Sequence, residues 1–421
     1  MKIAIVGGGF TGLACALCLI ENGFKVVLYE EESSLGGLAG GLHEKNWRWS
    51  LEYFYHHVFT TDKDILALAK NVGAKVLIKK PLTTSFLNKK EAQFDSPVSV
   101  LRFSGLSIFE RLRMGIGLAV LKLIPNGLFF EKYRVVEMLP RLIGKEGYAV
   151  IWEKLLMAKF GPFADKANMA WFWARVAKRT KNLGYIEEGF QSLAEKIGVY
   201  IEKKGGKIML NSSIDLYRFP IRSGMTEGKW TVGGEKFDGV VMTTPAPVAE
   251  KILGKKIKFP KINYLWGQTV ILELSEKLIS GYWMNILEKN WPFLVVVEHT
   301  NMIDKKYYGN NRIVYLGNYL PENSKQLQMD GGELITKYLP YLRKINKGFR
   351  KKWIKSIKVF RKPFAQPVFP LNYSKEVPQM KQDHKGLYLA NMSMVYPFDR
   401  GTNYAVKMGT EVAKKIIKDL R

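Results

Sequence analysis

The chain has 421 residues but only two cysteines and five histidines. Two cysteines cannot form a disulfide framework, so the sequence indicates a reducing compartment, the cytoplasm. The histidines and cysteines never stand together at the spacing of a metal site, and no metal centre is predicted. No serine or cysteine nucleophile motif is present either, so covalent catalysis by such a motif is not expected.

Acidic residues are also scarce. Lysine and arginine together number 65 and aspartate and glutamate 38, which gives a net charge of +27. Residues 334–375 contain no acid at all, and their basic residues alternate with aromatic ones such as Tyr338 and Trp353. Three interpretations stay open for this stretch: an anionic membrane surface, a solvated face or a nucleic-acid face. Because no nucleic-acid-binding signature accompanies it, no nucleic-acid partner is expected. The mixture of basic and aromatic residues favours anionic lipid.

Long apolar runs are absent too. The most apolar stretch, residues 115–130, is too short for a membrane-spanning helix and is interrupted by Lys122 and a Pro-Asn-Gly break at 125–127. It is either an interfacial anchor or channel wall, or a buried core helix of an inserted helical domain. We therefore expect a cytoplasmic protein, with peripheral contact to the inner face of the membrane as the open alternative.

The first informative feature of the sequence is a glycine motif that follows an apolar run. Residues 2–6 have the composition of a buried strand, and Gly7, Gly9 and Gly12 follow as G-x-G-x-x-G. Gly7 permits a tight turn, Gly9 allows the backbone to approach a pyrophosphate, and Gly12 allows helix and strand to pack closely. The sequence therefore has the loop of a dinucleotide-binding unit.

The context of this loop supports the same interpretation. Phe10 and Thr11 complete the loop before a helix of residues 13–22, whose N-terminal N–H groups and dipole favour phosphate. A second strand, residues 25–29, ends at Glu30, which can accept both ribose hydroxyls. Since strand, glycines, helix, strand and acid are in register, the sequence predicts dinucleotide binding. With the first strand beginning at residue 2, no secretory leader is expected.

A second glycine cluster begins six residues after Glu30. It contains Gly36 and Gly37, followed by Leu38. A simple nicotinamide-binding domain does not need this cluster. We interpret it as a segment that passes close to the bound dinucleotide a second time.

The two cysteines, Cys15 and Cys18, form a C-x-x-C in the second turn of the first helix. A redox pair is expected at a helix N-terminus, where the dipole lowers a thiol pKa. Packing as small apolar residues is therefore the favoured interpretation.

The coarse pattern predicts a discontinuous cofactor domain. Residues 61–179 are expected to be mostly helical, and strand-like runs dominate at 270–298 and 312–319. The last forty residues again have the pattern of a strand followed by a helix, as the first residues of the chain do. We predict an α/β fold in which a Rossmann-like domain is joined to a substrate domain of mixed sheet plus inserted helices. The expected boundaries are 1–61, 184–250 and 380–421 for the cofactor domain, 62–183 for the helical insertion, and 251–379 for the second sheet and basic region.

At four places in the right order, the chain resembles the superfamily of FAD-dependent amine oxidases, phytoene desaturases and protoporphyrinogen oxidases. These places are the opening motif with its trailing glycines, residues 189–208, residues 240–245 (VVMTTP) and residues 386–401. The resemblance implies a discontinuous GR2-type FAD-binding domain, FAD rather than NAD as the cofactor, and an electron acceptor of unknown class. The apolar stretch and the basic surplus suggest an apolar or lipid-like small-molecule substrate.

The resemblance also implies a set of cofactor-binding residues. They are Ile214, Thr244, Asn391, Asp399, Gly401, Thr402 and Asn403. A helix that begins at this last group would point its N-terminus at the flavin and stabilise negative charge on the reduced ring. Tyr396, just before that turn, is expected on the pocket wall as a candidate catalytic residue. The family usually has Gly-Asp where this chain has Ala390-Asn391, but an amide can still bond a ribityl hydroxyl or phosphate.

Two adjacent histidines carry the most specific resemblance. Residues 55–62 are similar to a bacterial protoporphyrinogen-oxidase-like subgroup, which places His56 and His57 near the flavin as candidate catalytic residues. The same stretch resembles the H-x-F-H-T context of UDP-galactopyranose mutase, although Thr60 stands where the second histidine should be. The alternative is that these histidines satisfy loop backbone groups.

Three functions follow from these observations. The first is an FAD-dependent oxidoreductase of desaturase, saturase or oxidase type, which acts on C–H or C–C bonds of an apolar, isoprenoid or lipid substrate. The second is a flavin-dependent nucleotide-sugar mutase, and the third is a cofactor-free binding module on the same fold. Further pocket candidates, which are equally compatible with surface strands, are Trp283, Asn285, Glu298, His299 and Thr300.

Overall fold

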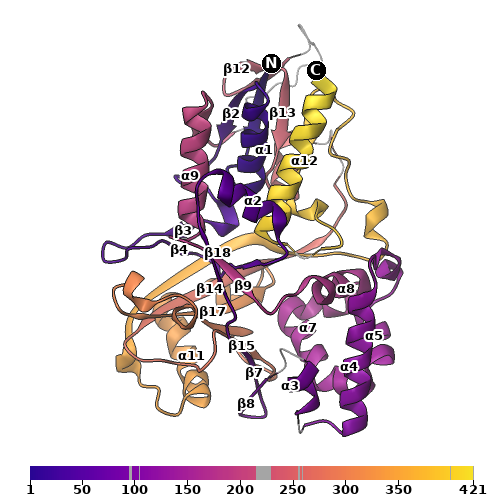
Figure 1. Ribbon diagram of the computed structural model, residues 1–421, viewed down its shortest axis with the longest axis vertical. Coiled ribbons are helices and arrows are strands. Elements are labelled where there is room, and N and C mark those ends of the chain that lie inside the picture. The colour runs from indigo at the N-terminus through magenta and orange to yellow at the C-terminus, as the bar shows by residue number, and fades with distance from the viewer. Residues whose placement is uncertain are drawn as a thin grey trace.

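The computed structural model describes residues 1–420 except 94–96, 104, 215–228, 255, 256, 258 and 399. Two sheets and a group of helices form three regions (Figure 1). The parallel sheet lies near the two chain termini, and the mixed sheet and the helical region lie side by side at the other end. Among the described residues, no helix combines the length and apolarity needed to cross a membrane.

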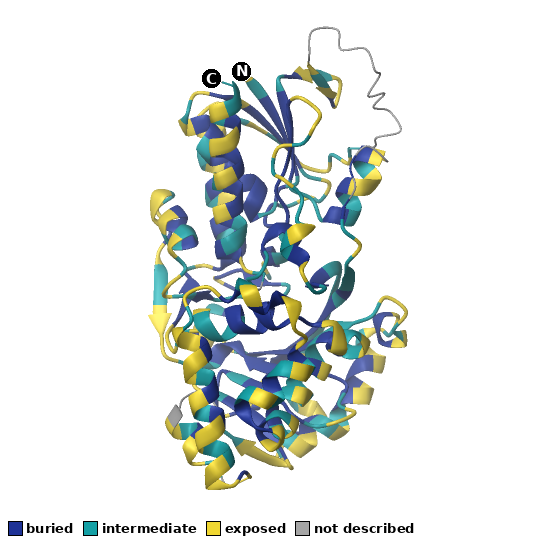
Figure 2. Cartoon of the chain, turned by 90° about the vertical axis from the view of Figure 1, so that its right-hand side faces the viewer, coloured by how far each residue is buried: buried dark blue, intermediate teal, exposed yellow. Residues whose placement is uncertain are grey.

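The parallel sheet has the strand order β10-β2-β1-β13-β19. Its strands are β1 (Lys2–Val6), β2 (Lys25–Tyr29), β10 (Lys207–Met209), β13 (Gly239–Met242) and β19 (Leu387–Leu389). The four strands from β2 to β19 are almost wholly buried, as expected for parallel strands rich in Val, Ile and Leu (Figure 2). Because these strands come from three separate stretches of the chain, the predicted Rossmann-like, discontinuous α/β arrangement is confirmed.

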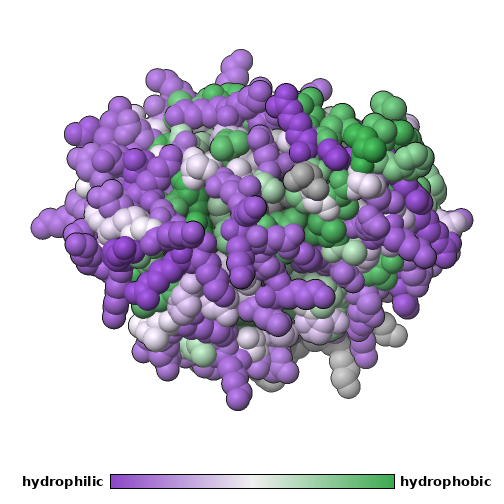
Figure 3. All heavy atoms as spheres, turned by 90° about the horizontal axis from the view of Figure 1, so that it is seen from below, coloured by the Kyte–Doolittle hydropathy of each residue, from purple (hydrophilic) through white to green (hydrophobic). Residues whose placement is uncertain are grey.

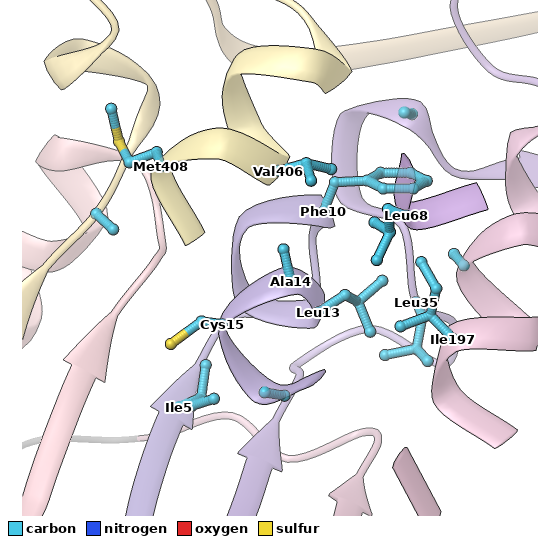
Figure 4. Close-up of a cluster of buried hydrophobic side chains, with 14 of the residues drawn as sticks. Ile5, Phe10, Leu13, Ala14, Cys15, Leu35, Leu68, Ile197, Val406 and Met408 are labelled. Carbon is cyan, nitrogen blue, oxygen red and sulfur yellow. The ribbon is translucent and has the colours of Figure 1, made fainter. Parts of the chain in front are cut away.

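Three helices pack around this sheet: α1 (Phe10–Glu21), α9 (Phe190–Lys203) and α12 (Thr402–Leu420). Helices α1 and α12 lie side by side. They approach so closely that a Cβ on Gly409 of α12 would lie only 2.2 Å from the carbonyl oxygen of Thr11. Figure 4 shows Leu13 of α1 directed toward Ile197 of α9, while Val406 of α12 lies beside Phe10 of α1 in the same apolar cluster.

The cysteines of α1 are packing residues. Cys15 is fully buried and lies between α1 and the sheet, next to Ile5 (Figure 4). Burial raises the pKa of the Cys15 thiol well above its ordinary value, and neither Cys15 nor Cys18 is in a disulfide. A buried thiol with a raised pKa is a poor nucleophile, so the packing interpretation is confirmed.

The mixed sheet has the strand order β18-β14-β17-β16-β15-β7-β8. Its strands are β7 (Thr83–Leu87), β8 (Lys90–Ala92), β14 (Asn263–Leu274), β15 (Trp283–Ile286), β16 (Val295–Glu298), β17 (Arg312–Leu320) and β18 (Ile354–Val368). All neighbours are antiparallel except β15 and β7. Helix α11 (Gly331–Ile345) covers this sheet and buries Leu334, Tyr338 and Leu342 in a core shared with Val270 and Leu316.

The helical region consists of α3 (Pro97–Leu101), α4 (Ile108–Leu123), α5 (Val135–Ile143), α6 (Lys145–Gly147), the π-helical turn η3 (Tyr148–Trp152), α7 (Glu153–Phe160) and α8 (Met169–Lys178). For residues 108–178, the expectation of a mostly helical segment is confirmed. Helix α2 (Lys63–Asn71) also lies within the expected helical segment, but it packs against α12.

The expectation of a mostly helical segment is wrong between α2 and α3. Strand β6 (Val76–Lys79) pairs with β9 (Leu183–Ile186), and β7 and β8 extend the mixed sheet. The partners of β6 and β7, which are β9 and β15, lie far away in the sequence, and local periodicity does not reveal such pairing. The shorter elements are β3 (Gly41–Leu42), β4 (Leu51–Glu52), β5 (Val58–Phe59), β11 (Trp230–Val232), β12 (Glu235–Phe237) and α10 (Ala246–Leu253).

The acid-free stretch 334–375 forms most of α11 and all of β18. Its aromatic residues Tyr338 and Phe349 are buried in the core of the mixed sheet. Lys358 pairs with Glu44 at 2.7 Å, and Lys362 pairs with Glu32. Some aromatic residues of this stretch are therefore core residues, whereas Tyr341, Trp353 and Phe360 are half-buried. Contact of this stretch with an anionic membrane surface stays a prediction.

Exposed apolar side chains gather on α4 instead. At intervals of three or four residues, this helix presents a stripe of side chains that are 47–82% exposed: Phe109, Leu112, Ile116, Val120 and Leu123. Its other face is buried through Met114 and Leu121. Figure 3 shows apolar atoms gathered on the side of the molecule where the helical region lies. Residues 115–130 are thus partly core and partly surface. The buried face agrees with a core helix of an inserted helical domain, and the interfacial anchor stays a prediction for the exposed face.

Candidate active site

One large cavity connects the three regions. Its volume is about 1710 Å³, and its walls include the loop between β1 and α1, residues of β7 and β15, and helices α4, α7 and α8. Ordinary small-molecule sites occupy about 300–1,000 Å³. The cavity therefore has room for a dinucleotide and a substrate together.

The glycines of the opening loop have different environments. Gly7 has a φ of +112°, a backbone conformation that favours glycine. A Cβ on Gly12 would lie 2.0 Å from the carbonyl oxygen of Gly7, so α1 can follow β1 this closely only without a side chain there. A Cβ on Gly9 would meet no atom of the described residues within 4 Å, and Gly9 lines the cavity with Phe10 and Thr11.

The second glycine cluster lies directly against this loop. Gly36 and Gly9 form a parallel β-bridge, and the N–H of Gly36 donates to the carbonyl of Gly8 at 2.9 Å. A Cβ on Gly37 would lie 3.3 Å from the Cα of Gly9. Gly36, Gly37 and Leu38 also line the cavity, so the chain passes the dinucleotide loop twice, as its sequence indicates.

Glu30 lies just after β2 and lines the cavity beside this loop. Its Oε2 accepts the N–H of Gly8 at 2.6 Å, and its Oε1 accepts the N–H of Glu32 at 2.9 Å. Burial raises the pKa of Glu30, and these two hydrogen bonds oppose the shift. Each carboxylate oxygen keeps a further lone pair, so the group can still accept ribose hydroxyls.

The remaining predicted cofactor residues do not all reach the cavity. Those that line it are Ile214, Thr244, Gly401, Thr402 and Asn403. The Oδ1 of Asn403 accepts two N–H groups in the first turn of α2, at 2.9 and 3.1 Å, so its side chain caps that helix. Asn391 lies off the cavity, and its Oδ1 accepts the N–H and hydroxyl of Ser393. Asp399 lies outside the described residues.

The residues around the glycine loop fit a dinucleotide cofactor. The N-terminus of α1 has Gly9 as its N-cap and no acid in its first turn, which suits phosphate. The N-terminus of α12, at Thr402, opens on the same cavity. The hydroxyl of Thr244 is buried with no hydrogen-bond partner among the described residues. Such a group costs about 1–3 kcal/mol, which a bound polar ligand relieves.

His56 and His57 line the cavity as neutral imidazoles. Nδ1 of His56 lies 2.5 Å from the carbonyl oxygen of Phe54 and must donate to it, which leaves Nε2 as the acceptor. Nδ1 of His57 is buried without a partner among the described residues, and its ring packs edge-on against Trp283. Burial lowers the pKa of His56 to about 4 and that of His57 to about 3. Both rings are therefore uncharged at pH 7.

Tyr396 is not brought together with the two histidines. It does not line the cavity, and its ring packs edge-on against Phe369 and Tyr373, with centroids 5.2 and 5.3 Å away. The structure thus puts Tyr396 in an aromatic cluster away from the pocket wall on which the sequence placed it.

The further pocket candidates divide into two groups. Trp283 and Asn285 line the cavity from β15. The side chains of the other three make hydrogen bonds within the protein. Glu298 accepts two backbone N–H groups at 2.8 and 2.9 Å. His299 hydrogen-bonds the Tyr308 hydroxyl, and Thr300 accepts a backbone N–H. Glu298 ends the wholly buried strand β16, and His299 and Thr300 begin a short 3-10 helix in which both are buried.

Sequence reasoning missed several cavity residues, namely Tyr55, Lys159, Trp171, Arg175, Tyr319 and Arg400. They come from α7, α8, β17 and the loops before β5 and α12, so no single motif contains them. Arg400 had the clearest signal, since it directly precedes Gly401. On α8, Asn168 caps the helix by accepting the Trp171 N–H at 3.0 Å, and Arg175 follows one turn later.

Two curated proteins are similar to parts of this chain. A zeta-carotene desaturase from Synechocystis is 25% identical over 266 residues, which are 56% of this chain and 53% of that protein. A probable zeta-carotene desaturase from Synechococcus elongatus is 29% identical over 157 residues, 34% of this chain and 32% of that protein. The chain thus spans about a third to a half of these relatives.

The chain shares its fold with a solved structure over almost its whole length. A crystal structure from an Exiguobacterium species, assigned as a protoporphyrinogen oxidase, covers 99% of this chain and 98% of its own, with a TM-score of 0.76 and 17% identity. At that identity the likeness concerns the fold alone. The sequence profile described as "flavin containing amine oxidoreductase" matches residues 10–417. FAD is therefore the cofactor, and this chain belongs to the flavin-containing amine oxidoreductase family.

Proposed function

We propose that this oxidoreductase works at a membrane surface and transfers a hydride between FAD and a C–H or C–C bond of an apolar lipid substrate. The observation that carries the proposal is the single cavity that joins the dinucleotide loop to an apolar helical wall. FAD supplies the hydride-transfer chemistry when bound. The mutase alternative lacks the second histidine of its motif, because Thr60 stands at that position.

The helical wall supports an apolar substrate. Met114 and Leu118 of α4, Leu155 of α7 and Phe172 of α8 all line the cavity. Such side chains exclude water and favour a hydrocarbon over a polar substrate. The names of the partly matching relatives, zeta-carotene desaturases, support the same class of substrate.

The protein's own residues would contribute orientation and charge stabilisation. The N-terminus of α12, which opens on the cavity at Thr402, would stabilise negative charge on a reduced flavin bound beside it. His56 holds its proton on Nδ1, so its Nε2 can accept a hydrogen bond without adding a charge. Trp283 and Asn285 complete the wall beside the histidines.

The first test of this proposal is the absorbance of the purified protein. We expect flavin bands that bleach on anaerobic reduction with dithionite. Reoxidation of the reduced protein, or bleaching of the oxidised protein, should then follow the addition of polyprenyl or polyene lipids. A flavin that responds to simple amines but to none of these lipids would contradict the proposed substrate class.

The exposed stripe on α4 is the proposed membrane contact. Its apolar side chains lie on the same helix whose residues Met114 and Leu118 line the cavity. Basic residues at both ends of the helix, among them Arg111 and Lys122, suit anionic headgroups. A lipid substrate could therefore pass from the bilayer to the cavity beside α4.

Changing the two most exposed residues of the stripe tests this contact. The double variant Phe109→Ser and Leu123→Ser removes two side chains that are each 82% exposed. We expect its binding to phosphatidylglycerol liposomes to fall by about tenfold or more, since each buried apolar side chain contributes about 1.5–3 kcal/mol. Sedimentation with liposomes measures the effect. Val199→Ser on α9, also exposed, is the matched control, and equal loss in both variants would contradict the proposal.

A further inference from the structure

A group of uncharged polar side chains surrounds the indole of Trp283 on the cavity wall. Trp283, Asn285, Tyr55 and His57 all line the cavity. The rings of Tyr55 and His57 pack edge-on against the indole, with centroids 5.1 and 5.9 Å away. Nε1 of Trp283 donates to Oδ1 of Asn285 at 2.9 Å. Because the three polar side chains contact one indole, they lie close together, although they come from β15 and the loop before β5.

Alternation along two paired strands adds Ser85 to this group. Strands β15 and β7 are parallel, and Asn285 stands opposite Ser85 in their register. The adjacent residues Met284 and Phe86 are buried in the core that α11 covers. Since successive side chains of a strand point to opposite faces, Asn285 and Ser85 face away from that core. Both residues line the cavity, so a hydroxyl and an amide lie side by side on its floor.

Hydrogen-bonding capacity remains unused in this group, which consists of Tyr55, His57, Ser85 and Asn285 and which we call the Trp283 cluster. No hydrogen bond joins the hydroxyl of Tyr55 or of Ser85 to another described residue. Asn285 uses one of its two amide N–H groups on the carbonyl of Thr84 at 3.4 Å, so the other stays available. Nδ1 of His57 has no partner among the described residues. Polar groups that face a cavity in this way favour a ligand that hydrogen-bonds them.

The Trp283 cluster is uncharged at pH 7. Burial raises the pKa of Tyr55 to about 12, although the charges of Arg400 and Arg175 oppose the shift, so the phenol keeps its proton. Burial lowers the pKa of His57 to about 3, so its imidazole is neutral. The serine hydroxyl and the asparagine amide do not titrate. Neutral donors and acceptors compensate the desolvation of a hydroxyl or a carbonyl, whereas a full charge requires an opposite charge.

The fold fixes Tyr55 in its place. A Cβ on Gly317 of β17 would lie 2.4 Å from the Tyr55 ring, so the glycine leaves room for the phenol against the sheet. The ring also packs edge-on against Tyr315, with centroids 6.0 Å apart. The hydroxyl of Tyr315 in turn donates to the carbonyl of Glu52 at 2.7 Å. A side chain held by packing on several sides can keep a ligand atom at one position.

We propose that the substrate is an apolar lipid with one uncharged oxygen group, a hydroxyl or a carbonyl, which hydrogen-bonds the Trp283 cluster while the hydrocarbon lies along α4 and α7. This inference rests on the function proposed above and narrows its substrate class. A pure hydrocarbon can slide along an apolar wall, so many of its carbons reach the cofactor. An oxygen held at one place fixes which carbon does so. The Trp283 cluster therefore positions the substrate for the reaction.

Three ligands of equal chain length test the proposal. Decan-2-one, decan-2-ol and decane are titrated into the FAD-loaded protein from a cyclodextrin stock that keeps them dissolved, and binding is followed by calorimetry and by the flavin spectrum. The ketone only accepts hydrogen bonds, whereas the alcohol also donates one, so their relative affinity identifies the oxygen group. Decanoate, which has a full charge on a chain of the same length, should bind more weakly than the ketone.

Single-hydroxyl variants locate the oxygen site. Tyr55→Phe and Ser85→Ala should each weaken the binding of the preferred oxygenated ligand by about threefold to tenfold, as expected for one lost hydrogen bond, and leave the affinity for decane unchanged. Tyr282→Phe is the matched control. Tyr282 also packs against His57 and Trp283, with centroids 6.4 and 6.5 Å away, but it is 1% exposed and does not line the cavity. Its variant should bind all ligands like the wild type.

The outcomes separate this inference from the proposed function. Unchanged affinity for both oxygenated ligands in Tyr55→Phe and Ser85→Ala, at normal flavin content, would overturn the oxygen site and leave the proposed oxidoreductase intact. An equal loss in Tyr282→Phe, or decanoate that binds more tightly than the ketone, would also overturn it. The expected losses in a protein whose flavin no lipid oxidises or reduces would contradict the proposed function and leave the oxygen site standing.

Discussion

Replacing Gly9 by alanine is expected to remove FAD from the purified protein without weakening the fold of the cofactor-free chain. Gly9 has φ −71° and ψ 174°, which alanine adopts without strain, and its Cβ would meet no atom of the described residues within 4 Å. The added methyl group would instead occupy cavity space beside the N-terminus of α1. We expect FAD affinity to fall by about a hundredfold, equivalent to roughly 2.7 kcal/mol.

Gly12→Ala is the matched variant because its clash lies inside the protein. Its Cβ would lie 2.0 Å from the carbonyl oxygen of Gly7, a backbone atom that cannot move aside without displacing β1 or α1. We expect Gly12→Ala to lose both FAD and stability, whereas Gly9→Ala loses only FAD. Flavin content after gel filtration and urea unfolding of the cofactor-free protein measure the two effects. Full FAD occupancy in Gly9→Ala would show that the cofactor does not approach this backbone.

Glu52→Gln is expected to make the protein more stable at alkaline pH relative to the wild type. Glu52 is 1% exposed, and its carboxylate accepts the Phe190 N–H at 2.7 Å and the Tyr185 hydroxyl at 3.0 Å. Burial raises the pKa of Glu52 to about 7 from an ordinary value of 4.5, although these hydrogen bonds oppose the shift. The folded state therefore binds this proton more tightly than the unfolded state does.

The sign of the pH dependence follows from that difference. Between pH 4.5 and 7 the native state carries more protons than the unfolded state, so the free energy of unfolding falls as the pH rises through this window. Glutamine does not titrate. The stability of Glu52→Gln minus that of the wild type should therefore rise by roughly 2–3 kcal/mol between pH 5 and 8, on the basis of 1.36 kcal/mol per pKa unit.

Urea unfolding of both FAD-loaded proteins at pH 5 and pH 8 measures this change. Glu188→Gln is a suitable control, because the hydrogen bond from Lys196 lowers the pKa of Glu188 and moves its titration below that window. Its stability relative to the wild type should stay constant between pH 5 and 8. A constant difference for Glu52→Gln as well would mean that Glu52 is ionised in the folded protein throughout this range.

Much of the cofactor domain could be predicted from sequence because its signals are local. Gly7, Gly9 and Gly12 stand within six residues, directly between a strand and a helix, and Glu30 ends the next strand. Each residue type is required by backbone geometry or by phosphate and ribose chemistry, so the pattern is informative without a tertiary contact. The helices of the insertion were predictable for the same reason, since an amphipathic period lies within one segment.

Other features depended on where distant segments meet. Strands β7 and β8 join the mixed sheet through pairing with β15, about 200 residues away, and no local pattern contains that partner. Asn403 lines the cavity, and its side chain also caps α2, because α2 and α12 lie side by side. The sequence did not reveal this second role. Tyr396 precedes the turn into α12, yet it packs with Phe369 and Tyr373.

The sequence by itself determined the dinucleotide loop, the discontinuous parallel sheet and the amine oxidoreductase family, since these rest on motifs in which neighbouring residues act together. Only the tertiary structure decided which basic residues line the cavity. Lys159, Arg175 and Arg400 are three basic residues among 65 in the sequence, and they share one cavity wall because α7, α8 and the loop before α12 meet around Trp171 and Tyr319. Electrostatic interaction depends on distance in space, which the order of residues does not specify.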